Sequence, residues 1–165
     1  MSEPFVSLVM AIRNEAPFIR KCLDSILSQD YPPDRIEVLV ADGMSTDGTG
    51  DIVKSYQAGR PNLRLIENRG MITATGLNAA ISSARGEIIV RMDGHSEMPL
   101  DYVRNCVAAL QRTGAEHVGS GVLTTGKTVF GEAVALAMST PFGVGGSRFR
   151  TTHREEWVDT VFLGG

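Results

Sequence analysis

An aspartate and a histidine stand two residues apart directly after an apolar run, in the stretch "RMDGHSEMP" at 91–99. In an extended segment the side chains of residues i and i+2 point the same way, so Asp93 and His95 can face one cation. A carboxylate suits Mg²⁺ or Mn²⁺, and the added imidazole shifts the preference toward Mn²⁺. The pair is therefore a candidate divalent metal site, although a pattern this short, taken alone, favours two solvated loop residues.

The elements that position this pair alternate between two periodicities. Four short apolar, β-branched runs predict strands covered on both faces, at 5–12, 36–42, 63–67 and 87–93. Helical stripes separate these runs: Phe18, Ile19, Cys22, Leu23, Ile26 and Leu27, then Ile52, Val53 and Tyr56, then Leu77, Ala80, Ile81 and Ala84. The alternation predicts an α/β fold with a mostly parallel central sheet, in one domain that spans residues 1–165.

Further boundaries come from capping and turn signals. The stretch "STDGT" offers N-cap candidates for the second helix, and Gly86 is a candidate C′ residue for the third. After Asp93, the spacing of Val103, Val107 and Leu110 predicts another helix. The later pattern predicts a strand at 117–123, a helix at 130–138 and a long loop at 139–154.

Polar residues follow all four predicted strands. Ligands of an open parallel sheet bind outside the carboxyl ends of its strands, so these residues are candidates for one site. They are Arg13, Asn14 and Glu15 after the first strand, Asp42 at the end of the second, Asn68 and Arg69 after the third, and Asp93 and His95 at and just beyond the end of the fourth. Such a set suits a ligand with a base, a ribose, phosphates and a cation. Alternatively, Asp42 forms a local turn or caps the next helix, and the arginines are surface charges.

Composition and missing motifs exclude several classes of protein. A net charge of -3 gives no basic footprint for nucleic acid. Neither the G-x-G-x-x-G fingerprint nor the P-loop follows the first strand, which disfavours a dinucleotide enzyme and a P-loop protein. Cys22 and Cys106 lie on apolar helix positions, which indicates buried free thiols in a reducing compartment such as the cytoplasm. No apolar stretch approaches the ~18 residues that a membrane-spanning helix needs.

Several separated segments resemble one known family. The segments "VSLVMAIRNEAPFIRKCLDSILSQDYP", "VLVADGMSTDGT" and "GLNAAISSARGEIIVRMDGH" are similar, in order, to the nucleotide-binding half of a family 2 inverting glycosyltransferase. The segments "MITATGLNAA" and "STPFGVGGSRFR" resemble the succinoglycan and exopolysaccharide branch. The resemblance implies a GT-A fold, which is a Rossmann-like three-layer sandwich.

The resemblance also implies roles for particular residues. Asp42 would accept a hydrogen bond from a base N–H. Asp93 would take the place of the first Asp of a D-x-D motif, binding ribose or metal, and His95 the place of the second, a metal position. The other residues expected to bind the nucleotide are Ala11, Arg13, Asn14, Glu15, Asn78 and Arg91.

The implied activity is a metal-dependent, inverting transfer of a hexose from a nucleotide sugar, with UDP-sugar first, to a saccharide or lipid-linked saccharide. Mn²⁺ or Mg²⁺ would be the cofactor. The chain is expected to be the N-terminal part of a longer enzyme, with the general base beyond Gly165 and a membrane-associated part at the cytoplasmic side of the membrane. Two alternatives remain: a nucleotidyltransferase that makes the sugar nucleotide, and a non-catalytic sugar-nucleotide-binding domain.

Overall fold

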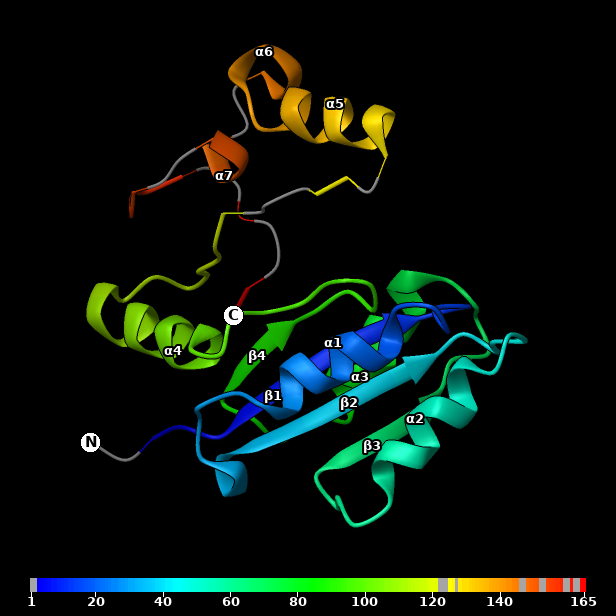
Figure 1. The fold of residues 1–165 in the computed structure, drawn as a ribbon. Coiled ribbons are helices and arrows are strands. Elements are labelled where there is room, and N and C mark those ends of the chain that lie inside the picture. The colour runs from blue at the N-terminus through cyan, green and yellow to red at the C-terminus, as the bar shows by residue number, and fades with distance from the viewer. Residues whose placement is uncertain are drawn as a thin grey trace.

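A computed structural model describes residues 3–121, 125–126, 128–145, 148–151, 154–158, 161 and 164–165, without the side chains of residues 149 and 150. Four parallel strands form the central sheet in the order β3-β2-β1-β4 (Figure 1). Their bounds are Val6–Ile12 for β1, Ile36–Asp42 for β2, Leu63–Glu67 for β3 and Ile88–Arg91 for β4.

Helices cover both faces of this sheet. The larger apolar cluster joins one face to α1 (Ile19–Leu27), α2 (Thr49–Gln57) and α4 (Tyr102–Thr113). The smaller cluster joins the other face to α3 (Thr73–Ser82). In β1, Val6, Leu8, Met10 and Ile12 belong to the larger cluster and Val9 to the smaller one, as the two-residue period of a strand requires. The predicted three-layer α/β fold is therefore confirmed.

The predicted boundaries hold best inside the sheet. Strands β2 and β3 have the predicted bounds, whereas β4 is shorter than predicted and ends before Asp93. The third helix ends at Ser82, so the prediction that Gly86 is its C′ residue is wrong. Gly86 instead packs on Ser7, where an added Cβ would lie 2.5 Å from the Ser7 backbone nitrogen. Ile81 is 48% exposed and does not belong to the apolar stripe of α3.

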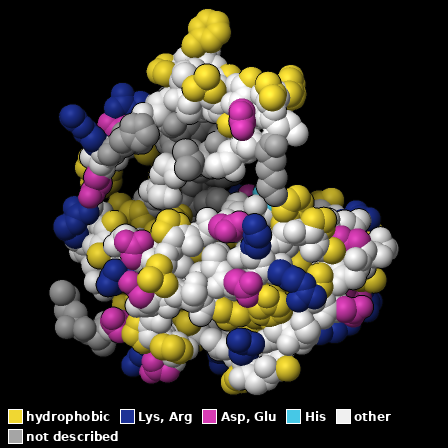
Figure 2. All heavy atoms as spheres, in the orientation of Figure 1, with side chains coloured by type: hydrophobic (Ala, Val, Ile, Leu, Met, Phe, Trp, Pro, Cys, Tyr) yellow, Lys and Arg dark blue, Asp and Glu magenta, His cyan; other side chains and the backbone are white. Residues whose placement is uncertain are grey.

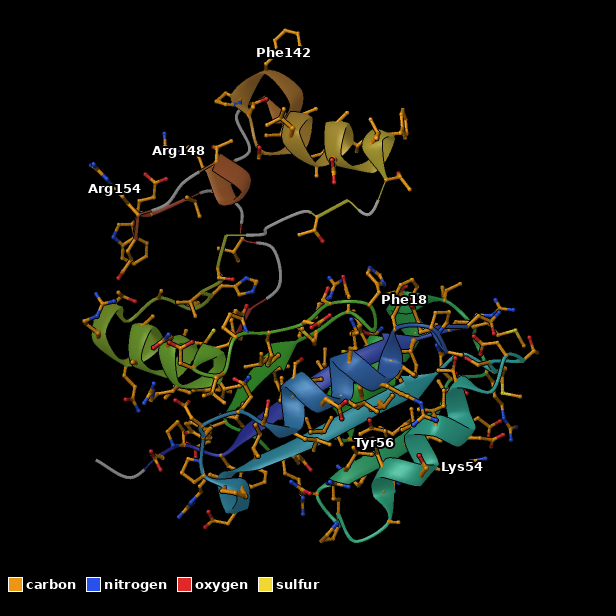
Figure 3. All side chains as sticks on the ribbon, in the orientation of Figure 1. Phe18, Lys54, Tyr56, Phe142, Arg148 and Arg154 are labelled. Carbon is orange, nitrogen blue, oxygen red and sulfur yellow. The ribbon has the colours of Figure 1, made fainter. Side chains whose placement is uncertain are left out.

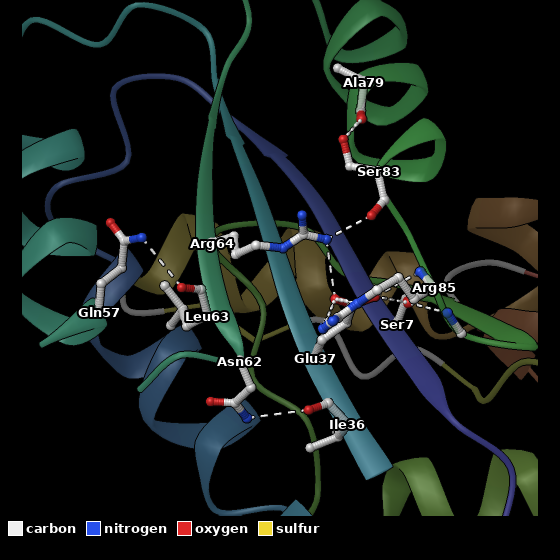
Figure 4. Close-up of polar contacts among 11 residues, drawn as sticks. Ser7, Ile36, Glu37, Gln57, Asn62, Leu63, Arg64, Ala79, Ser83 and Arg85 are labelled. Carbon is white, nitrogen blue, oxygen red and sulfur yellow. Dashed lines mark hydrogen bonds and ion pairs between the residues drawn. The ribbon is translucent and has the colours of Figure 1, made fainter. Parts of the chain in front are cut away.

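A buried glutamate occupies the amino end of the sheet (Figure 4). Glu37 is fully buried on β2, and its carboxylate accepts hydrogen bonds from the Ser7 hydroxyl at 2.7 Å and the Arg85 amide at 2.7 Å. The guanidinium groups of Arg85 and Arg64 lie 2.9 Å and 3.1 Å from it. Burial raises the pKa of the Glu37 carboxyl, but the hydrogen bonds from Ser7 and Arg85 outweigh burial and lower it.

The helices on one face are also joined by polar contacts. The Tyr56 hydroxyl on α2 donates a hydrogen bond of 2.8 Å to the Asp24 carboxylate on α1 (Figure 3).

Both cysteines are free and buried, as predicted. Burial raises the pKa of the Cys22 thiol to about 12 and that of Cys106 to about 11, so neither thiol is ionised at neutral pH.

The chain after α4 follows the predictions less closely. The predicted strand 117–123 is represented by an antiparallel bridge between Gly119 and Gly164, and positions 122 and 123 lie outside the described residues. The Arg91 amide of β4 donates to the Gly164 carbonyl at 2.9 Å, which places Gly164 beside the edge strand of the sheet. The predicted helix at 130–138 is confirmed as α5 (Val129–Met138).

The segment predicted as a long loop contains two four-residue helices, α6 (Pro141–Val144) and α7 (Arg148–Thr151). Helices α5 and α6, which are described throughout, contain no buried residue. Figure 2 shows hydrophobic side chains gathered over α5 and α6, where Phe130 and Phe142 are 80% and 101% exposed. Within the described part of the chain, no helix is long and apolar enough to cross a membrane.

Candidate nucleotide and metal site

A cleft of about 240 Å³ lies at the carboxyl edge of the sheet. Three segments line it: the end of β1 with its following loop, the loop between β3 and α3, and the end of β4 with its following loop. The lining residues are Ala11, Ile12, Arg13, Glu15, Asn68, Met71, Ile72, Thr73, Arg91, Asp93, Gly94 and His95. The topology thus brings together seven of the residues named as site candidates, namely Ala11, Arg13, Glu15, Asn68, Arg91, Asp93 and His95.

The turn after β4 is held tightly against the end of β1. A Cβ added at Gly94 would lie 2.7 Å from Ile12 Cγ2 and 3.3 Å from Glu15 Cγ. Glycine therefore lets this turn approach β1 and places Asp93 and His95 at the cleft. The carbonyl oxygen of Asp93 accepts hydrogen bonds from the Ser96 amide at 3.0 Å and the Cys22 thiol at 3.5 Å.

The side chains of the Asp-x-His pair each have one charged or titratable neighbour. The Asp93 carboxylate lies 3.1 Å from the Arg91 guanidinium, and His95 Nδ1 lies 3.1 Å from Glu15 Oε1. Asp93 is 23% exposed and His95 is 58% exposed at the side chain, so solvent reaches both. The contact between Glu15 and His95 spans 80 residues of sequence and was not predicted.

The loop after β1 is locked to the loop after β2. The Asn14 side chain accepts a hydrogen bond from the Thr46 amide, and the backbone amide of Asn14 donates to the Ser45 hydroxyl, both at 2.9 Å. Asn14 adopts a positive φ of 56°, which asparagine tolerates better than most residues. Asn14 thus holds the loop conformation and lies outside the lining that the described residues form.

The stretch "STDGT" acts differently from its prediction. Asp47 Oδ1 accepts the Thr49 amide at 3.0 Å, and Asp47 Oδ2 accepts the amide of Ala16, in the loop after β1, at 3.0 Å. The N-cap position of α2 is Gly48, which has no side chain to make a capping bond. The hydrogen bond from the Thr49 hydroxyl lowers the pKa of the Asp47 carboxyl. This stretch therefore links two site loops as well as starting the helix.

Two predicted nucleotide-binding residues lie apart from the cleft lining. Asp42, at the end of β2, accepts hydrogen bonds from the amide and hydroxyl of Ser45, which matches the local-turn interpretation of this residue. Asn78 is exposed on α3. Neither position tests whether a nucleotide contacts these side chains, so both roles stay predictions.

The loop between β3 and α3 forms a wall of the cleft in which Asn68 was a predicted candidate, whereas Met71 and Ile72 were not predicted. Asn68 is buried, and its side chain bonds the Ile72 carbonyl and the Thr75 hydroxyl at 3.0 Å and 2.7 Å. It shapes the loop that presents Met71 and Ile72, which are 42% and 60% exposed. These apolar residues come shortly after β3. The rule that ligands bind at the carboxyl ends of parallel strands, which identified Asn68, could therefore have identified them as well.

The donor set of the cleft fits a hard divalent cation that is completed by a ligand. Among the described residues, no group of three or more His, Cys, Asp and Glu side chains could hold a metal ion alone. Mg²⁺ is commonly bound through one or two carboxylates plus substrate phosphates, and Asp93 supplies one carboxylate, whereas the imidazole of His95 suits Mn²⁺ better. A metal-binding histidine usually donates its other ring N–H to a carboxylate, as Nδ1 of His95 can to Glu15.

An open parallel sheet with a polar cleft at its carboxyl edge is the arrangement in which doubly wound α/β domains bind their ligands. Residues 7–163 match the family described as Glycosyl transferase family 2, and the chain belongs to this family. The resemblance found in the sequence is thereby confirmed, and membership favours a transferase over a nucleotidyltransferase.

Several curated relatives are similar over most of this chain. Glycosyltransferase AglE of Haloferax volcanii is 35% identical over 72% of the chain and 40% of its own length. The succinoglycan biosynthesis protein ExoA of Rhizobium meliloti is 30% identical over 92% of the chain and 46% of its own length. The chain therefore spans about half the length of these relatives or less.

Solved structures agree on the fold. The mannosyltransferase PcManGT of Pyrobaculum calidifontis, solved with GDP-Man and Mn²⁺, is 38% identical, with a TM-score of 0.63 over 74% of this chain and 36% of its own. TarS of S. aureus, solved with UDP, is 24% identical, with a TM-score of 0.63 over 75% of this chain and 38% of its own. These neighbours are GT-A glycosyltransferases, so the predicted fold class is confirmed.

Proposed function

We propose that this chain is the donor-binding domain of a glycosyltransferase that moves a sugar, with inversion, from a nucleotide sugar to a saccharide or lipid-linked saccharide. The observation that carries the proposal is the cleft in which Asp93, His95 and Arg91 gather at the carboxyl edge of the sheet. Membership of family 2 supports the transferase chemistry.

The nucleotide would lie along the loops that follow β1 and β2. Ala11, Arg13 and Glu15 line the cleft, and the loop that contains them is hydrogen-bonded to the loop after β2. A preformed pocket of this kind reduces the ordering cost of binding. Asp42 and Asn78 would contact the nucleotide outside the cleft, from the end of β2 and from α3.

The cation would be held by the Asp93 carboxylate and an imidazole nitrogen of His95. Glu15 supports this arrangement, because a neutral His95 that donates its Nδ1–H to Glu15 keeps Nε2 available for a metal. Mn²⁺ or Mg²⁺ bound here would stabilise the negative charge that develops on the leaving diphosphate.

Two arginines would complement the diphosphate charge. Arg13 and Arg91 both line the cleft, and the Arg91 guanidinium also orients the Asp93 carboxylate at 3.1 Å. Arg91 Nε is buried and has no hydrogen-bond partner among the described residues. Preorganised cations near a developing charge lower the barrier without reorganisation at the moment of reaction.

The relatives guide the choice of donor and acceptor. We propose a UDP-sugar first, as the motif resemblance implies, and a GDP-sugar second, because PcManGT was solved with GDP-Man. A relative from Methanococcus voltae, 29% identical over 97% of this chain and 52% of its own length, is named as a transferase acting on a dolichyl-linked sugar phosphate. A lipid-linked acceptor would require the protein to work at a membrane surface.

Isothermal titration of UDP and of GDP, each with Mn²⁺ and with the metal chelated, tests this proposal. We expect one nucleotide to bind at least about tenfold more tightly with Mn²⁺, and Asp93→Asn to remove that gain. Asp51→Asn is the matched control, because Asp51 is an 84% exposed carboxylate on α2. Binding that ignores the metal would contradict the metal site, and no binding of either nucleotide would contradict the donor-site assignment.

A further inference from the structure

Polar side chains along one side of α1 contact the segment that follows the metal-site turn. Cys22, Ser25 and Gln29 are spaced three and four residues apart, so they lie on one side of α1 and of the turn after it. The segment they contact, residues 92–101, connects β4 to α4 without regular structure and begins with Met92 and Asp93.

The contacts follow that segment in order. The Cys22 thiol lies 3.5 Å from the Asp93 carbonyl oxygen, and the Ser25 hydroxyl accepts the Met98 amide at 3.2 Å. The Gln29 carboxamide donates to the Pro99 carbonyl at 2.7 Å. Each of these three side chains therefore bonds one backbone atom of the segment. A buried backbone polar atom without a hydrogen-bond partner would destabilise the conformation of the segment.

Two of these side chains bond in two directions. The Ser25 hydroxyl also donates to the Cys22 carbonyl at 2.8 Å. This bond fixes the orientation of the hydroxyl, whose oxygen then accepts the Met98 amide. The Gln29 carboxamide oxygen accepts the amide of Val103 at 3.0 Å, in the first turn of α4. First-turn amides have no partner within their own helix, so Gln29 supplies one.

The segment is anchored in the core on both sides of its charged residues. Met92 is 3% exposed and Met98 is 7% exposed, and both belong to the larger apolar cluster. Only five residues lie between them, and these include Asp93, Gly94 and His95. The position of Met98 therefore limits where the carboxylate and the imidazole can lie.

We propose that Ser25 and Gln29 are positioning residues that set the geometry of Asp93 and His95 for a metal-bound nucleoside diphosphate. This inference rests on the proposed function, since it concerns the same cleft. The two side chains do not line the cleft that the described residues form. They act through the backbone of residues 92–101, so their loss affects the metal contribution to binding more than the contacts of the nucleoside.

The test measures UDP or GDP affinity, whichever the wild-type chain binds, with Mn²⁺ and with chelator. In Ser25→Ala we expect the affinity gain due to Mn²⁺ to fall about fivefold, which corresponds to one lost hydrogen bond, while metal-free affinity stays unchanged. Ser25→Thr keeps the hydroxyl and should restore the gain. Ser28→Ala is the matched control, because the Ser28 hydroxyl bonds only the Ser25 carbonyl, at 3.1 Å, among the described contacts.

Gln29→Ala provides an independent second variant with the same expected direction. An unchanged affinity gain from Mn²⁺ in both Ser25→Ala and Gln29→Ala would overturn the inference. An equal loss of nucleotide affinity with and without metal would also overturn it, because that result indicates a general loosening of the domain. A wild-type chain that binds nucleotide without any metal gain contradicts the metal part of the proposed function and the inference together. Metal gain in the wild type that the variants keep contradicts the inference alone.

Discussion

The two ends of the central sheet hold similar charged groups in opposite conditions. At the amino end, five donor atoms from Ser7, Arg64 and Arg85 surround the fully buried carboxylate of Glu37. At the carboxyl end, Asp93 and His95 each have one charged or titratable neighbour and are exposed to solvent. The same kinds of side chain therefore form a closed structural cluster at one end and an open candidate site at the other.

The difference follows from what each cluster must do. A buried carboxylate is stable only when donors replace its lost water, which the Glu37 cluster achieves. A binding site must keep part of its coordination capacity for a ligand, and partial exposure leaves that capacity to Asp93 and His95. The comparison teaches that charge which solvent can reach, rather than charge itself, distinguishes the proposed functional end of this sheet.

The largest expected effect is on stability, from Glu37→Gln. This change removes the charge that faces Arg64 and Arg85 and should lower the free energy of unfolding by about 3 kcal/mol, measured by urea denaturation. Glu67→Gln is the control, because Glu67 is 54% exposed in a surface pair and should change stability little. A Glu37→Gln protein as stable as the wild type would break the comparison.

The same cluster predicts a pH dependence. Because the folded-state pKa of Glu37 is lowered, its contribution is complete above the ordinary value of 4.5 and is lost as the pH falls through the folded-state pKa. The stability difference between wild type and Glu37→Gln should therefore shrink in acid. A difference that stays constant from neutral pH down to pH ~3 would contradict this assignment.

The next largest effect is expected from Gly94→Ala at the open end. The added methyl group would overlap Ile12 Cγ2 at 2.7 Å, so the turn must move away from β1. Forced overpacking of this kind costs about 2 kcal/mol of stability, and it should also weaken metal-dependent nucleotide binding. Unfolding and titration experiments on one preparation measure both effects, and unchanged binding would show that this close approach does not position the site.

His95→Ala separates binding from stability. His95 is 58% exposed, so its loss should leave the melting temperature of the free protein nearly unchanged. Nucleotide affinity in Mn²⁺ should fall at least about tenfold, as expected for a lost metal contact. His117→Ala, at an exposed histidine outside the cleft, serves as the control. Equal metal-dependent affinity in the His95 variant would remove His95 from the site.

Glu15→Gln should have the smallest effect. Glutamine can still accept the His95 Nδ1–H, but the bond loses its charged acceptor. Nucleotide affinity in Mn²⁺ should fall about threefold, with metal-free affinity changing less. A loss as large as that of His95→Ala would instead indicate that Glu15 contacts the cation directly.

Much of this arrangement could be predicted from local sequence. The strand bounds of β2 and β3 follow from apolar β-branched runs, and the parallel order of the strands places Arg13, Asp93 and His95 at one edge. Family motifs supplied the roles of single residues. These signals act within a few residues of the chain, so one sequence is sufficient to show them.

The unpredicted features depend on contacts between distant parts of the chain. Glu37 lies in an apolar run, and its partner Arg85 is 48 residues away. The contact between Glu15 and His95 likewise needs the folded sheet to form. Ile81 fits a helical stripe but faces solvent, because α3 buries its small residues Gly76 and Ala80 instead. Periodicity indicates which side of a helix is apolar but not how closely that side approaches the sheet.

The most direct test of the account is paramagnetic broadening of amide signals by Mn²⁺ in the nucleotide-bound, ¹⁵N-labelled chain. The account predicts that signals of Asp93, Gly94, His95 and Glu15 disappear first, while those of Ser7, Glu37 and Arg85 at the other end of the sheet remain. Broadening centred on the amino end, or on neither end, would contradict the claim that the open cluster is the metal and nucleotide site.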